Sequence, residues 1–278
     1  RCRRHKGWGT IMDERPIGVF DSGVGGLTVA REILRQMPEE AIVYFGDTAR
    51  VPYGSKSRET VTRFSLQDVR FLLTKNVKAV VVACNTASAN SLPAMQAAFQ
   101  LPIFGVVEPG AKAGAKATKN GKVGVIATSS TIQSGAYQQA LRREPEVKEV
   151  YAKACPLFVP LAEEGWTEDE VADLTARRYL RELQDRGVDT LVMGCTHYPL
   201  LHHCIGEVMG PKVTLIDPAR ETILRVKEAL SSANALRQSD QPPQHHFYVS
   251  DRTAMFETIC RKAIGQVYEA EEIAIEQY

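Results

Sequence analysis

The sequence lacks several features that would assign it to a special class of protein. No stretch approaches the run of about 18 apolar residues that a membrane-spanning helix needs, so we expect no membrane helix. The formal net charge is only +1, and neither nucleic acid nor an anionic membrane surface is indicated as a partner. With 44% hydrophobic and 24% charged residues over 278 positions, the composition is that of a globular chain with room for roughly two domains.

Close cysteine pairs are also missing. The six cysteines are scattered, with no C-x-x-C pair: Cys2, Cys84, Cys155, Cys195, Cys204 and Cys260. This argues against a secreted disulfide framework and a C-x-x-C redox motif, and it favours a reducing, cytoplasmic compartment. The first eleven residues are basic and lack the apolar core of a signal peptide. We interpret 1–11 as an unpacked leader, with Met12 as a candidate start.

Short apolar segments alternate with helical patterns along nearly the whole chain, which is typical of an α/β protein with mostly parallel sheets. We expect strands at 17–20, 42–45, 79–83, 102–107, 122–127, 191–194, 213–216 and 246–249. Helices are expected to end near Met37 and to include 57–75, 95–99, 137–141, 219–230 and 252–265. Another helix should begin at a capping box formed by Thr167 and Glu170 and end at Gly187.

Two domains of similar build are expected. The segment 108–110, Glu-Pro-Gly, is interpreted as the point where the chain crosses to the second domain, with a return near 215. The first domain is then discontinuous, 12–107 plus 216–278, and the second is 108–215. The region around 161–164, between Pro160 and Gly165, is expected to be a loop.

Two segments with the same pattern carry the clearest chemical signal. Each is a hydrophobic strand that runs into a cysteine and a polar pair: Ala79-Val80-Val81-Val82-Ala83-Cys84-Asn85-Thr86 and Leu191-Val192-Met193-Gly194-Cys195-Thr196-His197. Open α/β sheets bind ligands at the carboxyl ends of their strands, so we expect two half-sites that face each other, each with a thiol. One such cysteine is more often a small buried apolar residue, but a matching pair favours a functional interpretation.

His197 follows the second cysteine by two residues and, if charged, could lower the pKa of that thiol. Zinc is an alternative, because five candidate ligands crowd this region: Cys195, His197, His202, His203 and Cys204. The spacing Cys195-x-His197 does not match the close ligand pairs of structural zinc sites. We therefore expect no metal.

A glycine-rich turn, Asp21-Ser22-Gly23-Val24-Gly25-Gly26, joins the first strand to the first helix. Such a turn offers backbone N–H groups and a positive helix end to an anion. Gly23-x-Gly25 also fits the start of a dinucleotide fingerprint, with Asp47 as the ribose acid, but Thr28 replaces the third glycine. A purely structural turn is the third interpretation. We favour a small carboxylate or ammonium ligand, bound with the help of Asp21 and Ser22.

Four blocks of the sequence, in order, resemble the glutamate racemase family. They are Phe20-Asp21-Ser22-Gly23-Val24-Gly25-Gly26-Leu27-Thr28, Tyr44-Phe45-Gly46-Asp47-Thr48-Ala49-Arg50-Val51-Pro52-Tyr53-Gly54, Ala83-Cys84-Asn85-Thr86-Ala87-Ser88 and Gly194-Cys195-Thr196-His197-Tyr198-Pro199-Leu200-Leu201. The resemblance spans about 17–230. Asp217-Pro218 departs from the Asp-Ser expected at that position.

The resemblance implies a cofactor-independent racemase with two α/β domains related by a pseudo-twofold axis and an active site between them. The family's two cysteines match Cys84 and Cys195, and its active-site glutamate resembles Glu163, although Glu164 is adjacent. The family's substrate-binding positions match Asp21, Ser22, Tyr53, Gly54, Asn85, Thr86 and Thr196, and His197 shares the strand end of the second cysteine. The resemblance further implies glutamate as substrate, D-glutamate for peptidoglycan synthesis, and a homodimer.

The chemistry fits these residues independently. Racemisation removes the Cα proton from one face of an amino acid and returns a proton to the other, which two opposed thiols can do as base and acid. A thiol pKa near ~8.5 keeps both protonation states within reach. Asp21 could orient the ammonium group or assist Cys84, and His197 or Glu163 could assist Cys195. The alternatives are an aspartate racemase of the same superfamily, a nucleotide-dependent oxidoreductase, and a non-enzymatic amino-acid-binding module.

Overall fold

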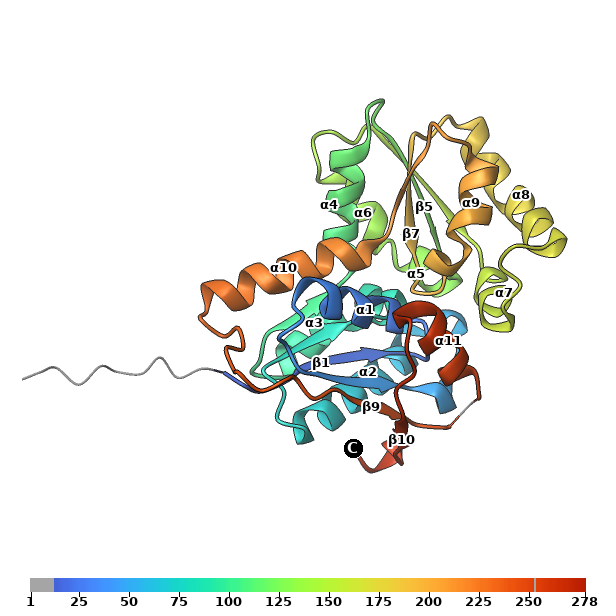
Figure 1. Cartoon of the computed structure of the whole chain (residues 1–278). Coiled ribbons are helices and arrows are strands. Elements are labelled where there is room, and N and C mark those ends of the chain that lie inside the picture. Colours follow the sequence, from blue (N-terminus) through green and yellow to red (C-terminus); the bar gives the residue numbers. More distant parts are fainter. Residues whose placement is uncertain (1–12, 253) are drawn as a thin grey trace, which may run out of the picture.

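Two parallel β-sheets with helices on both faces organise the chain (Figure 1). The computed structural model describes residues 13–252 and 254–278, so the expected leader 1–11 and Met12 lie outside the described residues. None of the helices in this described part is long and apolar enough to span a membrane. The expected α/β class with mostly parallel sheets is confirmed.

The first sheet has six parallel strands in the order β10-β9-β2-β1-β3-β4. Their bounds are β1 Ile17–Asp21, β2 Ile42–Gly46, β3 Ala79–Val82, β4 Ile103–Gly105, β9 His246–Val249 and β10 Ala270–Glu272. Its helices are α1 Leu27–Gln36, α2 Arg58–Thr74, α3 Asn85–Ala98, α10 Pro218–Ser232 and α11 Ala254–Ile264. We call this sheet with its helices the first lobe.

The second sheet has four parallel strands in the order β6-β5-β7-β8. Their bounds are β5 Lys122–Ala127, β6 Glu149–Ala154, β7 Thr190–Gly194 and β8 Thr214–Ile216. Its helices are α4 Val107–Ala117, α5 Ser129–Ser134, α6 Ala136–Arg142, α7 Phe158–Glu164, α8 Glu170–Asp185 and α9 His202–Met209. We call this sheet with its helices the second lobe.

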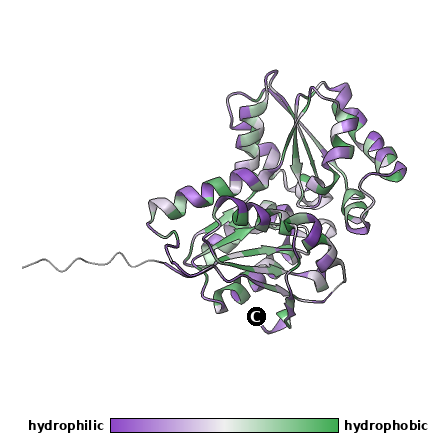
Figure 2. Cartoon of the chain, in the orientation of Figure 1, coloured by the Kyte–Doolittle hydropathy of each residue, from purple (hydrophilic) through white to green (hydrophobic). Residues whose placement is uncertain are grey.

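The central strands are apolar on both faces because helices cover both. All five residues of β1 are buried, and successive side chains enter different cores: Val19 packs with α1 and α10, whereas Phe20 packs with α2. Figure 2 shows the same arrangement, with hydrophobic strands inside and hydrophilic outer helix faces. The second sheet likewise lies between two apolar clusters, one including Leu180 of α8 and the other Leu141 of α6.

The chain leaves the first sheet after β4 and returns to it after β8, and the two crossing helices, α4 and α10, pack against each other (Figure 1). The residue-level domain boundaries stay a prediction. The expected crossing point 108–110 is not a break but part of α4. Pro109 is tolerated there because the first helical turn needs no donor from its N–H groups.

Three other local expectations need correction. Residues 161–164 form the end of the short helix α7, not a loop, and α7 ends at Gly165 with a left-handed φ of +79°. The N-cap of α8 is Asp169, which accepts from the N–H of Ala172, rather than Thr167. The strands β6 and β10 were not expected, because both lie at sheet edges and mix polar with apolar residues.

Short 3₁₀ turns follow the strands β2 and β7. Thr48–Arg50 and Tyr53–Ser55 form two such turns in the segment after β2. Tyr198–Leu201 forms another between Cys195 and α9. These turns keep the chain compact beside the ends of β2 and β7, which is where the candidate residues lie.

Candidate active site

The carboxyl ends of the two sheets meet, and polar residues from both lobes contact each other there. The hydroxyl of Thr196, which follows β7, donates to Asp21 Oδ1 at the end of β1 over 3.4 Å. Thr28 Oγ1 lies 3.4 Å from the backbone oxygen of Thr196. Gly25 must be a glycine, because a Cβ there would lie 2.5 Å from Thr196 Oγ1. The glycine turn therefore serves this close approach of the two lobes.

Cys84 lies two residues beyond β3 and is the N-cap of α3, so its sulfur accepts from the N–H of Ala87 over 3.4 Å. The thiol lies 3.5 Å from Ser22 Oγ, and the residue is only 4% exposed. Burial, then the charge of Asp21 and more weakly Cys195, raises the pKa of Cys84 to about 12, against the two hydrogen bonds. Cys84 is therefore a neutral thiol near neutral pH.

Cys195 has a different environment. Its sulfur lies 3.8 Å from Nδ1 of His197, whose Nε2 lies 3.0 Å from Oε1 of Glu163. Burial opposes the charge of His197, but its contacts with Cys195 and Glu163 outweigh burial and raise the His197 pKa to about 10. His197 is therefore charged near neutral pH, and this charge lies beside the sulfur of Cys195.

Glu163 reaches the site because it lies in the last turn of α7, whereas the neighbouring Glu164 is exposed. From the sequence alone, either Glu163 or Glu164 could be the active-site glutamate. Adjacent positions on a helix point in different directions, so only one of the two side chains can face the site. The structure brings Glu163 to His197 and leaves Glu164 outside.

Asp21 is fully buried at the centre of this region. Its Oδ2 accepts from the N–H of Gly23 over 3.1 Å, and its Oδ1 accepts from Thr196. Burial raises the Asp21 pKa, opposed by the charge of His197 and by these hydrogen bonds. Gly26 is also needed here, because a Cβ would lie 2.4 Å from Asp21 Cβ. Asp21 thus lies between the glycine turn of the first lobe and the cysteine turn of the second.

Asn85 and Thr86, at the start of α3, both contact the second lobe. Asn85 Oδ1 accepts from the hydroxyl of Tyr137 over 2.6 Å. Thr86 Oγ1 lies 2.9 Å from Thr128 Oγ1 and 3.1 Å from Thr131 Oγ1. Sequence reasoning did not single out Tyr137, Thr128 or Thr131 for a role, because only the fold brings them beside the Cys84 strand end.

Tyr53 and Gly54 lie in the second 3₁₀ turn. The hydroxyl of Tyr53 donates to Asp47 Oδ2 over 2.5 Å and lies 2.9 Å from Asp68 Oδ2. Both hydrogen-bonding partners of this hydroxyl are therefore carboxyl groups of the first lobe. Gly54 lies against the second lobe, since a Cβ there would be 2.6 Å from Thr128 Cβ. Of these two candidates, Gly54 is the one at the contact between the lobes.

Residues 17–226 match the family described as Asp/Glu/Hydantoin racemase. The chain is 55% identical to a glutamate racemase of Geobacter metallireducens over 255 residues, which cover 91% of this chain and 94% of that relative. The chain belongs to this racemase family.

Solved structures agree with the assignment to the racemase family. The crystal structure of a Francisella tularensis glutamate racemase in complex with D-glutamate is similar with a TM-score of 0.90 and 36% identity, covering 96% of this chain and 100% of that one. The glutamate racemase isoform RacE1 of Bacillus anthracis has a TM-score of 0.89 and 41% identity, covering 93% and 97%. The chain is therefore an enzyme, an isomerase, and the interpretations as an oxidoreductase or a binding module lose their support.

The racemase shows no metal centre in the part of the chain that the structure describes. There, no three His, Cys, Asp or Glu side chains gather so that they could hold a metal ion. His202 and His203 are exposed on α9, while Cys204 is buried. Cys195 and His197 contact each other, but the five residues considered as zinc ligands do not form one group of three or more that could hold a metal ion.

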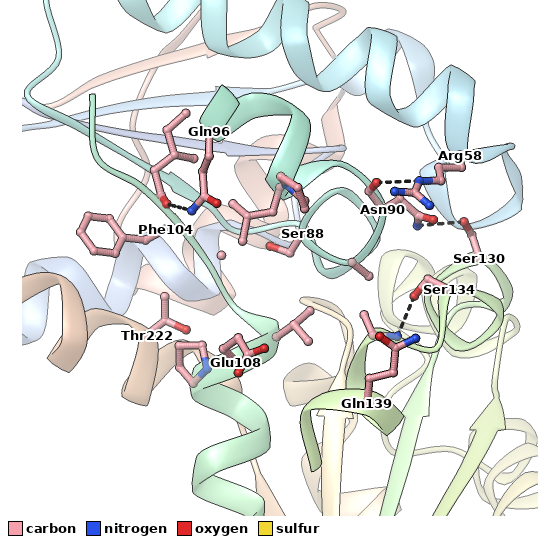
Figure 3. Close-up of a pocket in the computed structure, with 18 of the residues that line it drawn as sticks. Arg58, Ser88, Asn90, Gln96, Phe104, Glu108, Ser130, Ser134, Gln139 and Thr222 are labelled. Atoms are coloured by element: carbon pink, nitrogen blue, oxygen red, sulfur yellow. Dashed lines mark hydrogen bonds between the residues drawn. The ribbon is translucent and has the colours of Figure 1, made fainter. Parts of the chain in front are cut away.

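A cleft of the racemase lies elsewhere, and none of the candidate residues lines it. It has a volume of ≈ 870 Å³ and is lined from both lobes, with Arg58 donating to the backbone oxygen of Asn90 and Asn90 donating to Ser130 (Figure 3). By contrast, Cys84 and Cys195 are 4% and 7% exposed. Both thiols are thus almost completely closed off from solvent in this structure.

Proposed function

We propose that this racemase interconverts L-glutamate and D-glutamate without a cofactor, using Cys84 and Cys195 as the two proton-transfer groups. The observation that carries the proposal is the pair of thiols at matching strand ends in unlike surroundings. Cys84 is a neutral thiol beside Asp21, and Cys195 lies beside a charged His197. One acid and one base are the two partners that racemisation needs at the start of a turnover.

In the proposed reaction, the thiolate of one cysteine removes the Cα proton from one face of glutamate, and the electron pair stays on the substrate as a carbanion. The thiol of the other cysteine then gives its proton to the opposite face. The two sulfurs have exchanged protonation states at the end, so the reverse reaction uses them in opposite roles. His197, held by Glu163, acts on Cys195, and Asp21 acts on Cys84 or on the substrate ammonium group.

Binding of the two carboxylates is assigned to polar groups at the meeting strand ends. The proposed contacts are Ser22, Asn85, Thr86 and Thr196, together with the backbone of Tyr53 and Gly54. Hydrogen-bond donors in a site closed to water can stabilise the negative charge that develops on the substrate when the Cα proton leaves. We also propose that D-glutamate made here serves peptidoglycan synthesis in the cytoplasm, and that the enzyme is a homodimer with domains 12–107 plus 216–278 and 108–215.

Aspartate is the second candidate substrate, because the matched family includes enzymes named for both amino acids. Glutamate is favoured because the relative that is 55% identical to this chain is a glutamate racemase. A direct comparison of the two amino acids as substrates separates the candidates.

The deciding experiment is proton NMR of L-glutamate, and then of D-glutamate, with the protein in heavy water and no added cofactor. We expect loss of the Cα proton signal and appearance of the other enantiomer from either starting compound. Cys84→Ser and Cys195→Ser should each abolish interconversion, whereas Cys155→Ser, a buried cysteine beside the backbone oxygen of Lys153, should retain it. A folded protein that exchanges neither enantiomer would overturn the proposal, and exchange of aspartate alone would favour the second candidate.

A further inference from the structure

One hydrogen bond joins a candidate substrate-binding residue of the first lobe to a buried tyrosine of the second. The hydroxyl of Tyr137 on α6 lies 2.6 Å from Oδ1 of Asn85 at the start of α3. Tyr137 is completely buried, and burial, then the charges of Asp217 and Cys195, raises its pKa well above the ordinary value. The tyrosine is thus a neutral hydroxyl that always carries a proton to donate.

The number of available hydrogens determines which way the Asn85 amide points. Asn85 Oδ1 is the only acceptor that the Tyr137 hydroxyl meets in the described part of the chain. If the amide were turned around, its nitrogen would face the hydroxyl, and the buried hydroxyl proton would lose its acceptor, which is costly. The oxygen of Asn85 therefore points to Tyr137, and its NH₂ group points away.

The NH₂ group of Asn85 has no protein acceptor among the described residues, yet Asn85 is 5% exposed and its nitrogen is not one of the fully buried polar atoms that lack a partner. It directly follows Cys84 in sequence. An accessible donor beside the thiol, without a protein partner, is suited to a carboxylate oxygen of a ligand.

Two glycines, Gly110 and Gly194, leave the space that the Tyr137 side chain fills. A Cβ on Gly110 would lie 3.2 Å from the Tyr137 hydroxyl oxygen and 2.9 Å from Pro218, and a Cβ on Gly194 would lie 3.0 Å from the ring. Gly110 is on α4 and Pro218 begins α10, the two helices that cross between the lobes. The tyrosine is therefore fixed where the crossing helices meet, and its hydroxyl reaches Asn85 only when the lobes are together.

We propose that Tyr137 is a positioning residue that holds the Asn85 amide with its NH₂ group directed to a carboxylate of the substrate. This inference deepens the proposed function and depends on it. Because the hydrogen bond crosses between the lobes, the same contact makes the donor ready for the substrate as the lobes come together. Loss of the hydroxyl leaves the amide free to rotate, so it weakens substrate binding rather than proton transfer.

The test begins with Tyr137→Phe, measured with L-glutamate and with D-glutamate. A typical net hydrogen-bond contribution predicts that KM rises about 2- to 12-fold for both enantiomers, while kcat changes less than about twofold. Asn85→Ala should raise KM at least as much. In the Asn85→Ala background, Tyr137→Phe should change KM less than about twofold, because the tyrosine then has no amide to orient.

The matched control is Tyr198→Phe. Tyr198 is equally buried in the second lobe, and its hydroxyl donates to the backbone oxygen of Cys155 over 2.9 Å. We expect this variant to lower thermal stability about as much as Tyr137→Phe without the rise in KM. An unchanged KM in an active Tyr137→Phe enzyme, or an equal KM effect with and without Asn85, would overturn the inference while leaving the proposed function intact. Absence of glutamate racemisation in the parent protein would instead overturn the proposed function.

Discussion

The two thiols differ at the level of single residues, and the difference comes from what each one touches. Burial, and then the charge of Asp21, raises the pKa of Cys84 and keeps its proton on, against its contacts with a hydroxyl and a backbone N–H. Cys195 contacts an imidazole that Glu163 holds in the charged form. In the proposed reaction, this difference in environment assigns the acid and base roles to two chemically identical groups.

The substitution Glu163→Gln tests whether the charge of the His197 imidazole depends on Glu163. Replacing the carboxylate by a neutral amide removes a charge that stabilises the His197 cation, so the His197 pKa should fall from about 10. The alkaline limb of the kcat profile against pH should then move to lower pH. Glu164→Gln, at the exposed neighbour, is the control and should leave the profile in place. An unchanged profile in Glu163→Gln would show that this ion pair does not govern the reaction.

The raised His197 pKa also predicts how the stability of Glu163→Gln, relative to the parent protein, changes with pH. The folded His197 pKa is raised above the ordinary value of about 6.5, so its contribution to stability is complete below about pH 6.5 and is lost as the pH rises through about 10. The difference in unfolding free energy between parent and Glu163→Gln should therefore narrow as the pH rises across this window. Urea titrations at several pH values measure it, and a difference that widens with pH would contradict the assignment.

Asp21→Asn and His197→Asn probe the two sides of the proposed reaction. L- and D-glutamate have equal free energies, so kcat/KM must stay equal in the two directions for every variant. The values of kcat are not bound in this way. Each variant should lower kcat more in one direction than in the other, with opposite preference for the two variants. Equal losses of kcat in both directions would argue that neither residue is tied to one thiol.

At the scale of elements, a buried polar network fixes the segment between β2 and α2. Asp47 Oδ2 accepts from Arg50 Nε over 2.7 Å and from the Tyr53 hydroxyl, while its Oδ1 accepts from Ser250. Asp68 Oδ1, on α2, accepts from Arg50 Nη2 over 3.0 Å. The Tyr53 hydroxyl has one proton but lies within hydrogen-bond distance of both carboxyl groups. Burial, then the charge of Asp47, raises the Asp68 pKa well above its usual range, so Asp68 supplies the second proton.

Asp68→Asn and Asp47→Asn should therefore differ. An amide at 68 can accept from Arg50 with its oxygen and donate to Tyr53 with its nitrogen, as the protonated acid does, so we expect a change in unfolding free energy within about 1 kcal/mol. An amide nitrogen at 47 cannot accept from the donors there, and a loss on the order of 3 kcal/mol is expected for a broken buried ion pair. Equal losses measured by urea unfolding would contradict this proton arrangement.

The pH dependence of Asp68→Asn has the same sign as that of Glu163→Gln, because both His197 and Asp68 have raised pKa values in the folded protein. A raised folded pKa of an acid makes stability fall as the pH rises above the unfolded value, because the folded protein holds the extra proton. Removing the group should make the variant more stable relative to the parent as the pH rises from the acid range. A constant difference across that range would show that Asp68 is ionised in the folded protein.

The sequence predicted elements whose signals are local. The strand 122–127 has its expected bounds, and the apolar run before Cys84 is a buried parallel strand. Helices cover both faces of such a strand, so nearly all of its residues must be apolar, and this pattern is visible in the sequence. The helix around Glu163 was missed because Pro160 and Gly165 lie within seven residues of each other, yet Phe158, Leu161 and Ala162 bury one face of the short helix α7. Tyr137 and Asp68 carry no local signal, since their partners are 52 and 15 residues away and only the fold brings them together.

At the scale of the whole molecule, the contact between the lobes both encloses the thiols and limits what can stand there. The clearest example is Gly54, whose added Cβ would lie 2.6 Å from Thr128 Cβ and 2.7 Å from Thr128 Cγ2. Real Cβ atoms do not approach this closely, so the two lobes would have to separate at this point. Adding one methyl group at Gly54 therefore tests whether catalysis needs the two lobes to be in contact here.

Gly54→Ala should lower kcat/KM at least about tenfold in both directions, because a site held open misplaces the thiols and admits water. Thr128→Gly in the same chain removes the clashing side chain and should recover part of the loss, although it also removes the hydroxyl that contacts Thr86. Gly206→Ala is the matched control, since its Cβ would lie 3.7 Å from Leu215 Cδ1, an ordinary contact. Steady-state assays with both enantiomers measure the effect. Full activity in Gly54→Ala would mean that proton transfer does not require the lobes to meet at this turn, and that the enclosure of Cys84 and Cys195 has another purpose than catalysis.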